Sequence, residues 1–159
     1  MTRIAICAPS TPISREDAAR VEAIAASFPG LELTFHPQCY ASEDHFAGSD
    51  AVRLGALLEC ANDPAFDAVW FARGGYGANR IAMQAVAGME DAAEGKIFLG
   101  YSDGGYLLAA LYRAGIGRPV HAPMAVDIRR EGGQAAVERT LAYLDGNTAG
   151  LESSLDGCP

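Results

Sequence analysis

The sequence lacks the features that mark several special classes of protein. No apolar run approaches the length of about 20 residues that crosses a bilayer, so no membrane-spanning segment is expected. Basic residues are few: 12 Lys and Arg stand against 20 Asp and Glu, which gives a net charge of −8. A chain without a basic face is a poor partner for phosphates, which argues against binding to nucleic acids or to anionic membranes.

Cysteine motifs and metal-ligand clusters are lacking as well. The cysteines form no C-x-x-C pair, so neither a zinc site nor a disulfide framework is expected from Cys7, Cys39, Cys60 and Cys158. Cys7 lies in an apolar run and is expected to be a small core residue. Histidines and carboxylates do not gather at ligand spacing, so we expect no metal or organic cofactor. Met1 leads directly into a strand-like run without a signal-peptide pattern, which favours the cytoplasm.

What the sequence does contain is a regular alternation of strand-like and helix-like segments. Strands are expected over residues 3–8, 31–35, 67–72, 97–100 and 119–124, and helices over 14–27, 49–60, 78–87, 106–114 and 134–144. Repeated strand–helix units with short links predict an α/β fold with a mostly parallel sheet flanked by helices on both faces. We expect one domain over residues 1–146, a polar loop at 37–48, and a tail or linker at 147–159.

A serine motif lies where the fourth expected strand leads into a helix. Gly100-Tyr101-Ser102-Asp103-Gly104 has the G-x-S-x-G spacing of a nucleophile elbow, which holds a Ser on a sharp turn beyond the end of a sheet. Side chains at the two glycine positions would collide with the neighbouring backbone of such a tight turn. The N–H of Asp103 would be free to face a developing oxyanion. The same spacing also suits a glycine-rich turn whose Ser only caps a helix.

A second glycine-rich loop, Arg73-Gly74-Gly75-Tyr76-Gly77, follows the third expected strand. Ligands bind beyond the carboxyl ends of the strands in parallel sheets, so two such loops on neighbouring strands would flank one site. The alternative is a phosphate cradle, but the loop has neither the G-x-G-x-x-G spacing nor a Gly-Lys-Ser/Thr ending. The opening loop at residues 8–12 also follows a strand and is a further candidate to line the cleft.

Taken in order, these motifs resemble a known family. Residues 73–77, then Gly100-Tyr101-Ser102-Asp103, then His121-Ala122-Pro123-Met124 are similar to the amino-terminal half of the LD-carboxypeptidases. These are cytoplasmic serine peptidases that remove the terminal D-alanine from murein tetrapeptides during wall recycling, and the microcin-immunity peptidases share their fold. The resemblance covers almost the whole chain, including Ala8-Pro9-Ser10 and Ala47-Gly48-Ser49-Asp50 with Arg53.

The resemblance implies roles for residues of this sequence. Ser102 would be the nucleophile, and the N–H groups of Asp103 and Gly75 would hold the oxyanion. Gly74, Tyr76 and Tyr101 would line the cleft for a murein-derived peptide. The carboxylate of Asp103 is expected to be structural, orienting the turn or capping the helix that follows it. The complete protein would be a homodimer.

The chain differs from the family in the general base that would activate the nucleophile. The family takes a His, oriented by a Glu, from a carboxyl-terminal domain, and we expect both partners to lie beyond Pro159. His36, His45 and His121 are the histidines at hand, and each fits a structural or surface role better than that of a base. His121 is the best placed, although we expect it to be a hydrogen-bonded interior residue. A non-catalytic α/β module that binds a peptide or small molecule is the alternative function.

Overall fold

The core of the fold is a single sheet of parallel strands. In the computed structural model, which describes residues 1–148, the strands are β1 (Thr2–Cys7), β2 (Leu31–Phe35), β3 (Ala68–Phe71), β4 (Ile97–Gly100) and β5 (Arg118–His121). They lie in the order β2-β1-β3-β4-β5, and every neighbouring pair is parallel. Parallel pairing brings the carboxyl ends of all these strands to one edge of the sheet.

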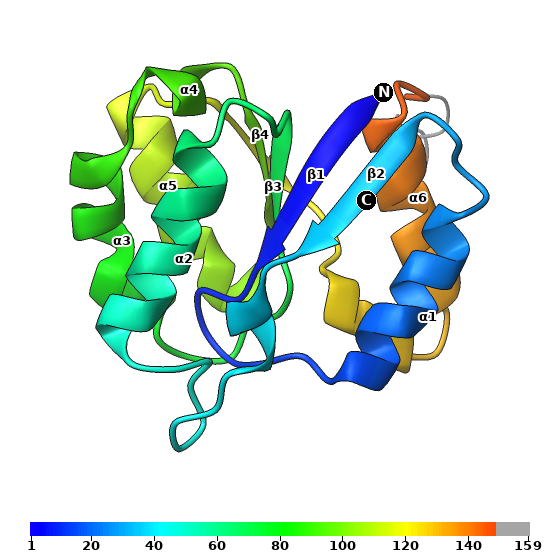
Figure 1. The fold of residues 1–159 in the computed structure, drawn as a ribbon, viewed down its shortest axis with the longest axis horizontal. Helices are drawn as coiled ribbons and strands as arrows, with labels where there is room; N and C mark the ends of the chain where they lie inside the picture. The colour runs from blue at the N-terminus through cyan, green and yellow to red at the C-terminus, as the bar shows by residue number, and fades with distance from the viewer. Residues whose placement is uncertain (149–159) are drawn as a thin grey trace, which may run out of the picture.

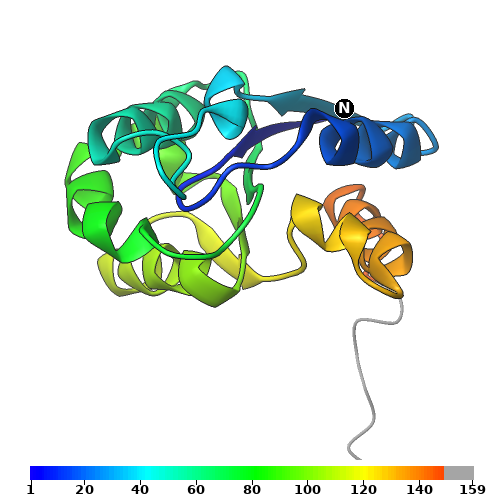
Figure 2. The same ribbon diagram turned by 90° about the horizontal axis from the view of Figure 1, so that it is seen from below.

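Helices cover both faces of this sheet, which confirms the predicted fold class. The α-helices are α1 (Arg15–Ala25), α2 (Asp50–Asn62), α3 (Ala78–Gly88), α4 (Asp91–Glu94), α5 (Gly105–Ala114) and α6 (Gly133–Leu144). Short 3₁₀ helices are η1 (Pro37–Tyr40), η2 (Ser102–Gly104) and η3 (Ala125–Arg129). Figure 1 shows α2, α3 and α5 on one side of the sheet and α1 and α6 on the other, and Figure 2 shows the same layers from below. Within the described residues, no helix is long and apolar enough to cross a membrane.

The central strands are buried on both faces because their side chains alternate between two cores. Ile6 and Trp70 pack with residues of α1 and α6, whereas Cys7 and Phe71 pack with residues of α2, α3 and α5. Cys7 is therefore a buried core residue, as its place in an apolar run predicts. A hydrogen bond with the Cys60 thiol, together with burial, raises the pKa of the Cys7 thiol well above its usual value. Cys158 lies outside the described residues.

Serine side chains cap two helices at the starts expected from the sequence, residues 14 and 49. The Ser14 hydroxyl oxygen accepts the backbone N–H of Asp17 at 3.1 Å at the start of α1. Ser49 accepts the N–H of Val52 at 3.4 Å at the start of α2. Such caps satisfy N–H groups that have no partner within the first helical turn.

Two segments differ from the sequence-based expectation. The fifth strand ends at His121 rather than at residue 124, because Pro123 has no N–H to continue the ladder and Met124 begins the cap of η3. The polar loop at residues 37–48 contains η1 and a single antiparallel bridge between Glu43 and Phe46. Most of the expected tail, residues 149–159, lies outside the described residues.

Replacing Asp17 with Asn should lower the free energy of unfolding at neutral pH by about 2 kcal/mol, because the carboxylate holds charge-assisted hydrogen bonds. Asp17 is buried and accepts hydrogen bonds from Ser14 and Arg129, each at 2.5 Å. Burial alone would raise the pKa of Asp17, but the bonds from Arg129 and Ser14 outweigh it and lower the pKa.

The effect of this substitution should depend on pH in a defined direction. Because the folded-state pKa of Asp17 lies below the unfolded value, its contribution is present above about pH 4 and is lost as the pH falls through the folded pKa. Urea unfolding at a series of pH values should show the gap between wild type and Asp17→Asn closing in acid. A gap that stays constant down to about pH 2 would contradict this account.

Candidate active site

Ser102 stands on a sharp turn directly after β4. The strand ends at Gly100, and η2 then leads into α5. The backbone φ of Ser102 is 55°, in the left-handed region that residues with a side chain rarely adopt. Strain of this kind is common where a functional side chain has to be presented in a fixed direction. The turn therefore has the local backbone conformation expected of an elbow.

The glycines on either side of the turn are required by a neighbouring ring. A Cβ atom at Gly100 would lie 2.6 Å from Cδ2 of Phe71, and one at Gly104 would lie 2.9 Å from the same atom. Real Cβ atoms do not approach other heavy atoms this closely. The obstacle is thus the Phe71 ring at the end of β3, and not the neighbouring backbone that we expected. The turn can pack onto β3 only without side chains at these two positions.

The loop after β3 lies directly against Ser102. A Cβ atom at Gly74 would be 3.2 Å from both Cβ and Oγ of Ser102, so the two loops meet as their place on neighbouring strands predicts. Gly75 has a φ of 114°, and a Cβ there would lie 2.5 Å from Cγ2 of Thr11. The Thr11 hydroxyl donates to the Gly74 carbonyl at 2.5 Å. The opening loop after β1 therefore borders the same site.

Asp103 uses its carboxylate to join these loops. Its Oδ2 atom accepts the Ser10 hydroxyl at 2.6 Å and the backbone N–H of Ala78 at 2.8 Å. The expected structural role is thus correct in kind, but the helix that receives the cap is α3. The helix that follows Asp103 in sequence, α5, has no side-chain cap at its start. Asp103 is buried.

A cavity of about 380 Å³ opens beside Tyr101, the residue that precedes Ser102. The Tyr101 hydroxyl donates to Oδ1 of Asp127 at 2.8 Å, and the Asp127 Oδ2 atom accepts the N–H of Met124 at 2.8 Å. Arg130 lies 3.2 Å from the same Asp127 Oδ1 atom. Burial and the hydrogen bond to Asp127 raise the pKa of Tyr101, so its hydroxyl remains a donor. Asp127 was not expected from the sequence, where its one signal is an acidic residue three positions after the cap residue Met124.

Tyr76 and His45 lie on a different side of the site from Tyr101. Tyr76 is half exposed, and its ring centroid is 6.0 Å from that of Phe46 and 6.1 Å from that of His45. The three proposed cleft residues therefore occupy different positions. Gly74 touches Ser102, Tyr101 lines the cavity, and Tyr76 belongs to an aromatic cluster at the surface.

The prediction that His121 is a hydrogen-bonded interior residue is wrong. His121 is exposed, since it ends β5 at the edge of the sheet, and its ring faces that of Tyr101 with the centroids 5.7 Å apart. Neither its imidazole nor the Ser102 hydroxyl makes a hydrogen bond within residues 1–148.

His36 has a carboxylate partner that its sequence position did not indicate. Its Nδ1 atom accepts the backbone N–H of Gln38, so its Nε2 carries the proton and donates to Glu59 at 2.9 Å. His36 follows β2, which is three strand spacings, or about 14 Å, from β4, and Glu59 lies in α2. His36 therefore cannot serve as a base for Ser102 in this arrangement.

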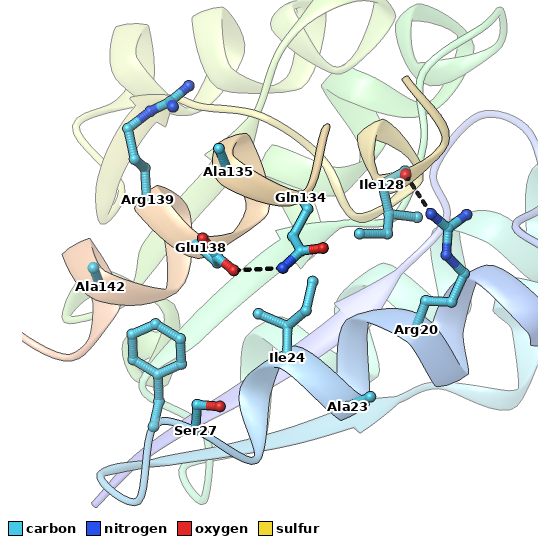
Figure 3. Close-up of a pocket in the computed structure, with 11 residues that line it drawn as sticks. Arg20, Ala23, Ile24, Ser27, Ile128, Gln134, Ala135, Glu138, Arg139 and Ala142 are labelled. Carbon is cyan, nitrogen blue, oxygen red and sulfur yellow. Dashed lines mark hydrogen bonds between the residues drawn. The ribbon is translucent and has the colours of Figure 1, made fainter. Parts of the chain in front are cut away.

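A larger cavity, of about 720 Å³, lies between α1 and α6 and away from the carboxyl ends of the strands (Figure 3). Gln134 donates to Glu138, one turn further along α6, at 2.8 Å, and the Arg20 guanidinium donates to the Ile128 carbonyl at 2.9 Å. These polar groups already have hydrogen-bond partners, and the rest of the lining consists of apolar side chains such as Ile24 together with Ser27 and Arg139. The candidate site is therefore centred on Ser102, although this cavity is larger than the one beside Tyr101.

Gly75→Ala should destabilise the protein by about 2 kcal/mol, because Ala at a φ of 114° is strained and its Cβ would lie 2.5 Å from Thr11. Gly55→Ala is the matched control. Gly55 lies within α2, and a methyl group added there would meet no neighbouring element within 4 Å, so Ala should be neutral or stabilising. Thermal unfolding measures both variants, and equal melting temperatures would refute the assigned conformation of Gly75.

The known proteins to which this chain is similar belong to one group of carboxypeptidase-like proteins. The family model described as the LD-carboxypeptidase N-terminal domain matches residues 4–122. A Streptomyces coelicolor protein whose name reads "Putative carboxypeptidase" is 37% identical over 135 residues, which cover 79% of this chain and 41% of that protein. Murein tetrapeptide carboxypeptidase of Pseudomonas aeruginosa is 28% identical over 155 residues, covering 90% of this chain and 50% of the enzyme.

Solved structures agree with this assignment. Muramoyltetrapeptide carboxypeptidase from Oxalobacter formigenes superposes with a TM-score of 0.66 at 29% identity, over 78% of this chain and 40% of that one. An MccF-like protein from Bacillus anthracis has a TM-score of 0.72 at 23% identity over 90% of this chain and 44% of its own, a likeness of fold alone. The chain spans half or less of the length of these relatives. Because the family match includes both glycine-rich loops and the serine turn, this chain belongs to the family of LD-carboxypeptidase N-terminal domains.

Proposed function

We propose that this chain is the nucleophile-bearing part of a serine carboxypeptidase of the LD type, with Ser102 as the nucleophile. The observation that carries the proposal is the close approach of Gly74 to a Ser102 held at a φ of 55°. Because Gly74 has no side chain, a substrate carbonyl would have room between the two loops, next to the Ser102 hydroxyl. The substrate would be a murein tetrapeptide, and the leaving group its terminal D-alanine, cleaved from an L-to-D peptide bond.

In the proposed reaction, Oγ of Ser102 attacks the scissile carbonyl carbon. The carbonyl oxygen becomes an oxyanion that accepts hydrogen bonds from the backbone N–H groups of Asp103 and Gly75. Each such donor typically contributes about 3–4 kcal/mol of transition-state stabilisation. Only glycine suits this position, because its φ is 114° and a Cβ there would lie 2.5 Å from Thr11. Tyr101 and Tyr76 would contact the peptide on either side of the scissile bond.

The base would come from outside the described residues. Ser102 is a poor nucleophile until a neighbouring group takes its proton, and its hydroxyl has no hydrogen-bond partner within residues 1–148. We infer that a His, oriented by a Glu, is supplied by a carboxyl-terminal domain of the kind that completes the longer relatives. The complete enzyme would act in the cytoplasm as a homodimer, as the family resemblance implies.

The 159-residue chain alone should release almost no D-alanine from an L-Lys-D-Ala or diaminopimelate-D-Ala peptide. Without the His and Glu partners of Ser102, only the oxyanion hole and substrate binding contribute to catalysis. They typically raise the rate by roughly 10³–10⁴ over the reaction in water. A form extended by about 100–150 residues, a typical domain length, should turn the peptide over. The measurement is D-alanine release from both forms and from the extended Ser102→Ala variant.

Three results of this assay have distinct meanings. Activity only in the extended form with Ser102 intact supports the proposal. Robust turnover by the 159-residue chain would mean that the base lies within it, so the two-part account would be wrong. Peptide binding without turnover by every form would favour the non-catalytic module instead.

A further inference from the structure

One peptide group of the glycine-rich loop is held from both sides by buried charged side chains. The carbonyl oxygen of Gly77 accepts a hydrogen bond from Nη1 of Arg53 at 2.9 Å. The N–H of Ala78 donates to Oδ2 of Asp103 at 2.8 Å. These two groups belong to the same peptide unit, which joins the loop after β3 to the start of α3. A cation at the carbonyl and an anion at the N–H both favour one orientation of its dipole.

The same two side chains also hold the loop after β1. Nη1 of Arg53 donates to the Pro9 carbonyl at 2.5 Å, and Asp103 Oδ2 accepts the Ser10 hydroxyl at 2.6 Å. Arg53 and Asp103 therefore bind two consecutive residues of the loop after β1. In the loop after β3 they bind the carbonyl and the N–H of one peptide group. The turn that carries Ser102 is tied to both loops through the side chain of Asp103.

The burial of these groups shows how strongly the arrangement is constrained. The Arg53 side chain is fully buried, and burial lowers its pKa, although an ion pair with Asp50 opposes this effect. Its Nε atom donates to the Gly48 carbonyl at 3.2 Å. A buried guanidinium is stable only when its donors are satisfied, so removing any partner should be costly.

The loop needs such an anchor because of its glycines. Gly75 and Gly77 have φ values of 114° and 123°, and glycine has more backbone freedom to lose than any other residue. A Cβ at Gly77 would lie 2.8 Å from Nη1 of Arg53 and 2.9 Å from the Phe46 ring. The loop therefore closes directly over the Arg53 guanidinium, two residues from the Gly75 amide.

We propose that the side chains of Arg53 and Asp103 form one positioning unit that holds the Gly75 N–H in place opposite Ser102. Asp103 then serves both oxyanion donors: its backbone N–H is one of them, and its carboxylate fixes the loop that carries the other. This inference rests on the proposed function, in which the two backbone N–H groups bind the oxyanion.

The test uses the 159-residue chain and a boronic acid, N-acetyl-boroalanine of L configuration. Oγ of Ser102 adds to boron and its proton passes to the buffer, so a negative tetrahedral adduct forms without a general base. Affinity is measured by boron NMR, and the amide signals of Gly75 and residue 103 are followed in nitrogen–proton spectra. The variants are Asp103→Ala and Arg53→Met. Ser102→Ala is the negative control, because it has no hydroxyl to form the adduct.

Asp103→Ala separates the two roles because it keeps the backbone N–H and removes only the carboxylate. We expect it and Arg53→Met to weaken adduct formation about tenfold or more, since a displacement of about 1 Å can cost a factor of about 100. Both should also shift the Gly75 amide signal and speed its hydrogen exchange in the free protein. Asp103→Asn, which keeps an acceptor oxygen without the charge, is the milder variant if Asp103→Ala does not fold.

Asp17→Ala is the matched control, because Asp17 is an equally buried carboxylate that accepts a Ser hydroxyl but contacts neither loop. It should lower the melting temperature without changing adduct affinity or the Gly75 signal. If Arg53→Met and Asp103→Ala bind the boronate as wild type does, with an unchanged Gly75 amide, the positioning unit is refuted. If the extended form with Ser102 intact also forms no Ser102 adduct, the proposed function fails, whereas exchange at Gly75 in the 159-residue chain still decides whether the two side chains hold the loop.

Discussion

The hydrogen bonds accepted by the buried carboxylate of Asp103 are the interaction on which the candidate site depends. They reach Ser10 after β1 and Ala78 at the start of α3, while Asp103 itself follows β4. Three loops that are far apart in sequence are thereby joined at one oxygen atom. A parallel sheet brings these loops to one edge, but only side-chain contacts of this kind can set their relative positions to within a fraction of an ångström.

Steric contacts, in addition to these hydrogen bonds, restrict which residues can occupy the loops of the site. The Phe71 ring excludes side chains at Gly100 and Gly104, and Thr11 excludes one at Gly75. The Phe71 ring at the end of β3 and Thr11 in the loop after β1 thus pack against the glycines of the site, while Ser102 is exposed. Strain at Ser102 is maintained because the surrounding packing leaves the turn no alternative path.

The charged groups around the site fall into two separate networks. Asp103 and Arg53 hold the loops on one side, whereas Asp127, Tyr101 and Arg130 border the cavity on the other. In both networks the carboxylate accepts hydrogen bonds from the loops around it, and neither carboxylate is hydrogen-bonded to the Ser102 hydroxyl within residues 1–148. This is why we propose that a base comes from outside the described residues.

The sequence by itself determined the class of fold, the sites of both glycine-rich loops and the elbow motif, because these depend on local periodicity and on residue types with distinct backbone preferences. Only the tertiary structure decided which side chains meet. The partner of His36, the ring that requires Gly100, the helix that Asp103 caps and the exposure of His121 all depend on which strands are neighbours and which strand is at the edge. Contacts between residues that are far apart along the chain leave no periodic signal in one sequence, so packing alone could assign them.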